Sequence, residues 1–219
     1  MYSKSSSDYF NKLFMKQVCG PYEIPQSIKD YAEEVAPLLM EERTHKTLDG
    51  GKDFSYRGVI MQEMFHWWLD EVHNKYPHEY LPPYQKTGKP RNENGELIPW
   101  DLKIAGKTFD TKCRGFWWKE SPPNMELLFT QTEYDDREEN KVDCYLVGVT
   151  DGGETFKYDR KNVNNVYLLG GLDYYDFWDT MKPKKEFKSN GEQREYKIPT
   201  YGYISAKDLK TFNEVVFRV

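Results

Sequence analysis

Two aspartates and a lysine stand close together in the middle of this 219-residue sequence. Asp110 and Lys112 are separated by one residue, and Asp101 precedes Asp110 with eight residues between them. Mg²⁺ binds carboxylate oxygens and water, and it can neutralise a phosphate, activate water and stabilise a leaving oxygen. A nearby lysine can orient or deprotonate the water, or stabilise the charge of the transition state. These residue types therefore indicate metal-assisted hydrolysis of a phosphodiester.

The aspartates are expected to meet because residues 100–114 have the pattern of a β-hairpin with a tight turn at 105–107. Side chains of a strand alternate between two faces, so Asp110 and Lys112 share one face. Pairing of the two strands across the turn would bring Asp101 close to Asp110. The competing interpretation is a solvated outer face, because alternating charges are common on exposed hairpins.

Further residues complete the expected site. The carbonyl of Thr111 is a candidate metal ligand beside the lysine. Glu63 falls within the apolar arc of a predicted helix, where a glutamate is unusual, and is a candidate catalytic acid and metal ligand. Lys103, Lys107 and Arg114 flank the acids on the hairpin and are the expected contacts to nucleic acid.

Composition limits the class of protein. A net charge of −5 argues against a nucleic-acid packaging protein, and less so against a nuclease, whose metal offsets its carboxylates. Three cysteines without CxxC spacing argue against a disulfide framework or a structural zinc site, and indicate a reducing compartment. The chain begins without an apolar signal core and has no apolar run long enough to span a membrane. We therefore expect a cytoplasmic protein, in a cell or in the host of a virus, with no membrane partner.

The order of predicted elements indicates a mixed α/β fold, in which helices flank a small mixed central sheet. Residues 1–50 are expected to be an N-terminal helical extension packed on an α/β core of residues 51–219, in a single domain overall. Helices are predicted before Gly20 and at about 25–46 (with a kink or break at Pro37), 55–75, 125–136 and 172–181, and after Ser205. Strands are predicted, besides the hairpin, at 142–149, 155–158, 163–169, 201–204 and 215–219, and 77–95 is expected to be a surface loop.

The segment Pro99-Trp100-Asp101, eight residues, then Asp110-Thr111-Lys112 resembles the motif of the PD-(D/E)xK nuclease superfamily, which has a restriction-endonuclease-like fold. A helix with an acid before the hairpin, and a helix and an apolar strand after it, are similar to that family's order of elements. The likeness spans residues 54–149 and departs from a strict Pro-Asp pair at Trp100.

This resemblance implies a Mg²⁺-dependent nuclease, with Mn²⁺ as a possible substitute. Asp101 and Asp110 would be the metal ligands, Lys112 the catalytic lysine, and Glu63 the helical acid. DNA is expected as substrate more than RNA, and endonuclease more than exonuclease activity, with a homodimer possible. Two alternatives stay open: an inactive nuclease-like domain that binds nucleic acid or protein, and an RNA endonuclease of the cap-snatching type, for which His66 is the candidate histidine ligand.

Overall fold

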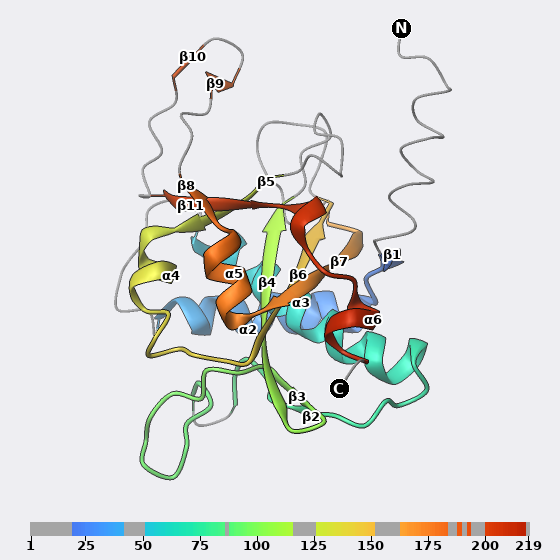
Figure 1. Cartoon of the computed structure of the whole chain (residues 1–219). Coiled ribbons are helices and arrows are strands. Elements are labelled where there is room, and N and C mark those ends of the chain that lie inside the picture. Colours follow the sequence, from blue (N-terminus) through green and yellow to red (C-terminus); the bar gives the residue numbers. More distant parts are fainter. Residues whose placement is uncertain are drawn as a thin grey trace, which may run out of the picture.

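A six-stranded mixed sheet forms the centre of the molecule, and helices cover both of its faces (Figure 1). The computed structural model describes residues 19–41, 51–85, 88–115, 126–151, 163–183, 188–189, 192–193 and 200–217. In sheet order, the strands are β1 (Cys19–Glu23), β7 (Asn165–Asp173), β6 (Cys144–Thr150), β4 (Lys107–Gly115), β3 (Leu102–Ile104) and β2 (Glu79–Tyr80). The mixed α/β fold class predicted from the sequence is therefore confirmed.

The described helices differ greatly in length. They are α2 (Gln26–Glu41), α3 (Gly51–Trp67), the π-helical turn η1 (Trp68–Val72), α4 (Gln131–Asp135), α5 (Tyr174–Thr180), the 3-10 turn η4 (Ala206–Asp208) and α6 (Phe212–Val215). A second sheet contains β5 (Glu126–Thr130), β11 (Thr200–Ser205) and β8 (Lys182–Pro183), and β9 (Lys188–Ser189) pairs with β10 (Glu192–Gln193). Among the described residues, no helix has the length and apolar character needed to cross a lipid bilayer.

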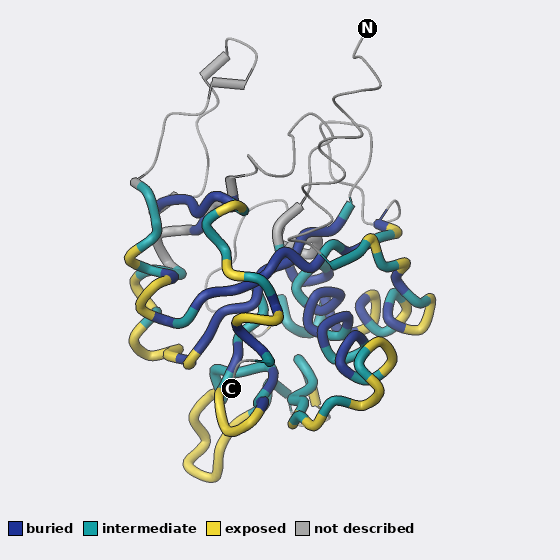
Figure 2. Tube along the Cα trace, turned by 45° about the vertical axis from the view of Figure 1, so that its right-hand side comes forward, coloured by how far each residue is buried: buried dark blue, intermediate teal, exposed yellow. Residues whose placement is uncertain are grey.

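Buried residues lie along the central strands and along the helices that pack on the sheet (Figure 2). On one face, α2 and α3 pack over the strands, with Ile60 and Phe109 fully buried between them. On the other face, α5 and the second sheet enclose a core that includes Tyr145 and Phe177. β4 contributes Phe109 to the first core, and the alternation of its side chains directs Asp110 to the other face, away from α3.

The predicted hairpin is confirmed by β3 and β4, which pair antiparallel with Leu102 opposite Phe109 and Ile104 opposite Lys107. Ala105 and Gly106 form the turn with φ of 48° and 83°. Two consecutive positive φ angles are typical of a type I′ turn, whose twist matches that of the paired strands. On its other side β4 pairs in parallel with β6, the strand predicted at 142–149.

The prediction of one helix at 125–136 is wrong, because part of this segment pairs with a distant strand. Its first half is the strand β5, in which Leu127 and Phe129 are both fully buried, and only the short α4 is helical. The strand forms because β11 supplies an antiparallel partner, and such pairing overrides the weak helix preference of a short segment.

Other elements also differ from the sequence prediction. The strand expected at 215–219 is replaced by α6, since a capping box between Thr211 and Glu214 starts a helix that includes Val215. The expected loop at 77–95 contains β2, and α2 continues through Pro37 without a break. The helix predicted before Gly20 and the strand at 155–158 lie outside the described residues.

Candidate active site

Asp101 directly precedes β3, where the pairing of β3 with β4 stops; beyond Phe109, β4 has no strand partner on this side among the described residues, and this stretch is called its open edge. The N–H of Asp101 donates to the carbonyl of Phe109 (2.8 Å), and the charge of Asp110 acts on the carboxyl of Asp101. Its Oδ2 accepts hydrogen bonds from the N–H (2.8 Å) and the hydroxyl (2.6 Å) of Thr111. These three contacts hold Asp101 against the open edge of β4.

Asp110 and Lys112 form an ion pair on the face of β4 that turns away from α3. The Lys112 Nζ lies 2.8 Å from the Asp110 Oδ2, and the side chains are 21% and 17% exposed, so the pair is largely covered but still reaches solvent. The Lys112 ammonium also lies 5.5 Å from the ring centre of Tyr145 on the neighbouring strand β6. The lysine is therefore held beside Asp110 and is largely covered.

Burial and neighbouring charges shift the pKa values of both Asp101 and Lys112. Burial, followed by the charge of Asp110, raises the pKa of the Asp101 carboxyl to about 7, against the hydrogen bonds from Thr111 and the charge of Lys112. Burial by itself would lower the pKa of Lys112, but the charges of Asp110 and Glu133 raise it above its usual range. The lysine is therefore cationic at neutral pH, and the two aspartates still repel each other.

Glu133 is a residue of this site that the sequence did not reveal. It lies on α4, and its charge acts on both Lys112 and Tyr145. The hairpin motif gives no signal for it, because α4 reaches the lysine only through the pairing of β5 with β11. Glu133 thus adds a third carboxylate to the surroundings of Lys112.

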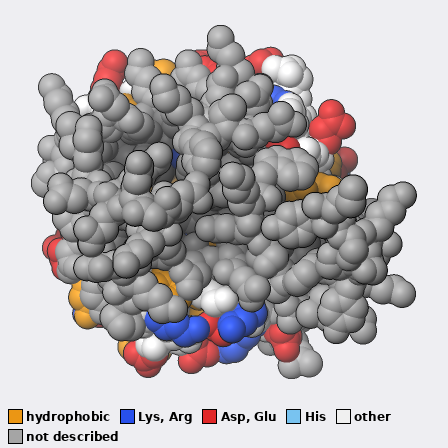
Figure 3. All heavy atoms as spheres, turned by 90° about the horizontal axis from the view of Figure 1, so that it is seen from above, with side chains coloured by type: hydrophobic (Ala, Val, Ile, Leu, Met, Phe, Trp, Pro, Cys, Tyr) orange, Lys and Arg blue, Asp and Glu red, His pale blue; other side chains and the backbone are white. Residues whose placement is uncertain are grey.

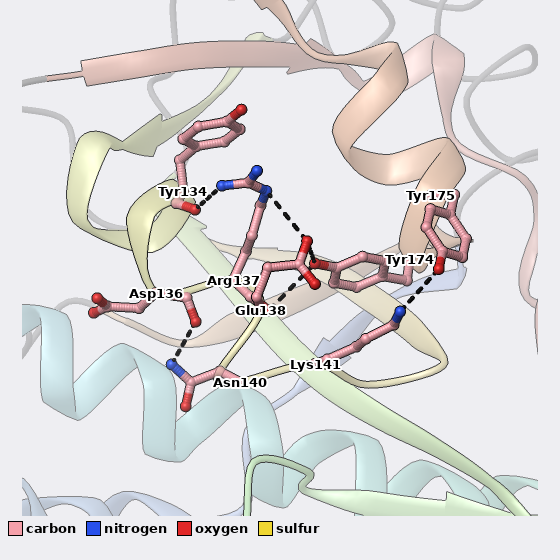
Figure 4. Close-up of polar contacts among 8 residues, drawn as sticks. All are labelled: Tyr134, Asp136, Arg137, Glu138, Asn140, Lys141, Tyr174 and Tyr175. Atoms are coloured by element: carbon pink, nitrogen blue, oxygen red, sulfur yellow. Dashed lines mark hydrogen bonds and ion pairs between the residues drawn. The ribbon is translucent and has the colours of Figure 1, made fainter.

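The segment after α4 holds this helix in place (Figure 4). The guanidinium of Arg137 lies 3.7 Å from the ring centre of Tyr134 and donates to the Tyr134 carbonyl (2.7 Å). The hydroxyl of Tyr174, on α5, donates to Glu138 (2.9 Å), and Lys141 donates to the hydroxyl of the next residue of α5 (2.8 Å). These contacts tie the connection between α4 and β6 to α5, and so limit the movement of Glu133.

Glu63 approaches the site from the opposite side of the sheet, because α3 packs on the face that carries Phe109. Its Oε1 accepts a hydrogen bond from the hydroxyl of Tyr80, on β2. Burial raises the pKa of the Glu63 carboxyl, an effect that this hydrogen bond opposes. Burial and the charge of Glu63 raise the pKa of Tyr80 strongly, and Asp101 adds to the effect. The structure therefore connects Glu63 with Asp101 through Tyr80.

The basic residues predicted to contact nucleic acid are spread over the hairpin. Lys103 pairs with Glu79 on β2 (3.2 Å). Lys107 is exposed at the turn, where its charge acts on Cys144 at the start of β6. The backbone of Arg114 belongs to β4, but its side chain is outside the description. Among the described side chains visible in Figure 3, basic groups lie beside acidic ones at the rim of the molecule.

The oxygen donors at the open edge of β4 fit a hard divalent cation. Among the described residues, the second oxygen of Asp101, Oδ1, accepts no hydrogen bond. The carbonyl of Thr111 points to the same edge as its N–H, because both groups of one strand residue point the same way. Two repelling carboxylates and a carbonyl provide the kind of ligands that Mg²⁺ prefers.

Comparisons of this chain with models of protein families, with curated proteins and with solved structures found no match. The features that indicate a function therefore belong to the site itself: two carboxylates beside the open edge of β4 and a cationic lysine on the same strand.

Proposed function

We propose that this protein is a metal-dependent nuclease that hydrolyses phosphodiester bonds, with DNA favoured over RNA and internal cleavage favoured over cleavage from an end. The observation that supports it most is the convergence of Asp101, Asp110 and Lys112 at the open edge of β4. The order of elements adds support, since α3, the β3–β4 hairpin, α4 and the parallel strand β6 follow the sequence order of the PD-(D/E)xK nucleases that the motif resembles.

Asp101, Asp110 and the Thr111 carbonyl are the groups that would hold Mg²⁺ or Mn²⁺. When bound, the metal supplies positive charge that neutralises the scissile phosphate and activates water. The buried carboxyl of Asp101 favours such a cation, because an ionised carboxylate beside Asp110 is costly without one. The hydrogen bonds from Thr111 orient Asp101 before any ligand arrives.

Lys112 is suited to stabilise negative charge. Its raised pKa keeps the ammonium protonated at neutral pH, so it can donate hydrogen bonds to a phosphate oxygen or orient a water molecule, and it is a poor proton acceptor. Asp110 and Tyr145 fix the direction of its Nζ. Of the roles that the sequence left open for this lysine, charge stabilisation is the one that the contacts favour.

The two alternative functions, a cap-snatching RNA endonuclease and a binding domain without hydrolysis, require different residues at the site. A cap-snatching RNA endonuclease requires a histidine beside the aspartates, whereas His66 contacts His78, Asp70 and Tyr80. We therefore leave histidine out of the proposed nuclease centre. A domain that binds without hydrolysis requires no catalytic metal, and it would retain binding of nucleic acid when its carboxylates are neutralised.

The proposal is tested by incubating the purified protein with single- and double-stranded DNA and RNA, in Mg²⁺, Mn²⁺ or EDTA. We expect cleavage of DNA that requires the metal and is lost in Asp110→Asn. The matched control is Asp179→Asn, because Asp179 is an exposed aspartate on α5 that should leave cleavage unchanged. Metal-independent cleavage, or equal activity of Asp110→Asn and wild type, would contradict the proposal. Binding without cleavage under all conditions would favour the binding domain.

A further inference from the structure

A second group of possible metal ligands lies at the C-terminal end of α3. The Nδ1 of His66 is 2.8 Å from the Nε2 of His78, and the Nε2 of His66 is 3.7 Å from the Oδ2 of Asp70. One ligand atom from each of the three residues can be chosen so that all lie within 4.8 Å of one another. The side chains of His66 and Asp70 are 30% and 36% exposed, so a metal ion can reach them from solvent.

The backbone after α3 takes an unusual path that brings these residues together. The helix widens into the π-helical turn η1, in which the N–H of His73 donates to the carbonyl of Trp68 (3.1 Å). Asn74 and Lys75 then adopt φ of 53° and 59°, which reverses the chain and returns His78 to the side of the helix. Short π-helical turns such as η1 are frequent at functional sites. Positive φ at residues other than glycine is energetically costly.

The hydrogen bonds of His78 leave one ring nitrogen suited to a metal. Its Nδ1 lies 2.6 Å from the backbone carbonyl of Tyr76, and a carbonyl can only accept, so Nδ1 carries the hydrogen. In neutral His78 the lone pair is therefore on Nε2, the atom that faces His66. Histidines bound to metals commonly have this arrangement, with one nitrogen on the metal and the other donating to a carbonyl.

His66 is also held in a fixed orientation. Its ring stacks on that of Tyr80, with the centres 4.0 Å apart and the planes at 7°. Histidines 66, 73 and 78 lack zinc-like spacing with cysteine, and the sequence predicts surface positions rather than ligands for His66 and His73. Sequence periodicity does not show the reversal at Asn74 and Lys75, which returns His78 to the helix.

We propose that His66, Asp70 and His78 bind one Zn²⁺ ion, with water completing the coordination. Two imidazoles and a carboxylate suit Zn²⁺ and related transition metals, whereas Mg²⁺ prefers oxygen alone. Ligands about 2.0–2.1 Å from a tetrahedral ion stand roughly 3.3 Å apart. With one nitrogen taken from each histidine and one oxygen from Asp70, the ligand atoms lie within 4.8 Å of one another, so side-chain rotations can bring them onto an ion.

This ion would join the end of α3 to the segment that leads into β2. Tyr80 belongs to β2 and donates to Glu63, so the ion would also fix the tyrosine against which His66 stacks. The proposed zinc site is separate in residues and in metal preference from the proposed nuclease centre. The experiment on the zinc site measures metal binding, so its outcome does not depend on whether the protein cleaves nucleic acid.

The experiment uses the full chain without a histidine tag, stripped of metal, with titration of Zn²⁺ by calorimetry and of Co²⁺ by visible absorption. We expect one equivalent of Zn²⁺ with micromolar or tighter affinity, a rise in melting temperature, and Co²⁺ absorption bands that 100-fold excess Mg²⁺ does not remove. His78→Gln should weaken binding by about 100-fold or more, and Asp70→Asn by about 10-fold to 100-fold.

His73→Gln is the matched control, because His73 lies in the same turn but packs on Trp68 and Phe217. It should bind Zn²⁺ like the wild type, and circular dichroism should show that every variant is folded. If His78→Gln does not fold, Asp70→Asn decides the matter. The proposal is overturned if the wild type binds no stoichiometric Zn²⁺, if Mg²⁺ displaces the metal, or if His73→Gln weakens binding as much as the ligand variants.

Discussion

Asp101 and Asp143 bind opposite edges of strand β4 in the same way: each accepts hydrogen bonds from the N–H and the hydroxyl of one threonine of the strand. The Oδ2 of Asp101 accepts from the N–H (2.8 Å) and hydroxyl (2.6 Å) of Thr111, and the Oδ2 of Asp143 accepts from the N–H (2.8 Å) and hydroxyl (2.9 Å) of Thr108. Asp101 stands beside Asp110 in a covered site, whereas Asp143 is exposed to solvent. Asp143 is therefore a control for Asp101, because it makes the same hydrogen bonds to the strand outside the proposed site.

Asp101→Asn and Asp143→Asn should separate chemistry from structure. Both variants keep an oxygen that can accept from the threonine, so both should fold. We expect Asp101→Asn to lower metal-dependent cleavage by about 100-fold or more, because it removes a charged metal ligand. Asp143→Asn should retain nearly full activity. Equal losses in the two variants, measured as initial cleavage rates, would indicate that the hydrogen bonds matter and the charge does not.

The stability of the metal-free protein should depend on pH through Asp101. Its pKa is about 7 in the folded chain, above the ordinary value of 3.8. Its protonated form therefore stabilises the fold; this contribution is fully present below pH 3.8 and is lost as pH rises through 7. Between pH 5 and pH 8 in EDTA, wild type should lose about 2 kcal/mol relative to Asp101→Asn. Unfolding in denaturant measures this difference, and equal changes in the two proteins would contradict it.

Lys112→Met and Lys112→Arg test whether the lysine acts by its charge. The methionine variant leaves Asp110 and Glu133 without their shared cation, so we expect cleavage to fall by about 100-fold to 1,000-fold while Mg²⁺ binding is unchanged or tighter. The arginine variant keeps the charge and cannot accept a proton, so it should recover part of the activity. Calorimetry with Mg²⁺ and single-turnover cleavage give the two readouts. Full activity of Lys112→Met would remove this residue from the mechanism.

Glu63→Gln should have an intermediate effect. The amide oxygen can still accept from Tyr80, so the fold and the position of α3 are retained. The variant removes the negative charge from the partner of Tyr80, a tyrosine on which the charge of Asp101 also acts. We expect cleavage to fall by about 10-fold, which is at the low end for loss of an outer-shell partner. A loss as large as that of Asp110→Asn would place Glu63 directly on the metal, and no loss would make it a structural acceptor.

Two glycines offer a test of the packing that supports the site. A Cβ at Gly170 would lie 2.1 Å from the carbonyl oxygen of Lys210, and the residue has φ of +138°. Gly170→Ala should therefore lower the free energy of unfolding by about 2 kcal/mol or more. Gly58, in α3, has no atom within 4 Å of an added Cβ. Gly58→Ala should raise the free energy of unfolding by about 0.5–1 kcal/mol, because alanine favours a helix. Opposite signs in chemical denaturation are the expected result.

The sequence was sufficient where local pattern determines structure. Alternation along residues 100–114 predicted the hairpin and the shared face of Asp110 and Lys112, whereas it did not determine the register: the turn expected at 105–107 is formed by Ala105 and Gly106, and Lys107 pairs with Ile104. The apolar run at 142–149 gave the buried strand β6 for the same reason. These features depend on side-chain periods and turn chemistry within a few residues.

Tertiary structure decided what long-range pairing controls. Residues 126–130 form the strand β5 because they pair with β11, and this pairing places Glu133, on the following helix, near Lys112. The reversal at the end of α3 brought His78 back to His66, although no local period joins them. Local periodicity therefore determined that Asp110 and Lys112 share one face of β4. Which residues surround that pair, and how their charges and burial shift its pKa, depended on contacts between segments distant in the chain, because hydrogen-bond partners and desolvation arise only when those segments pack.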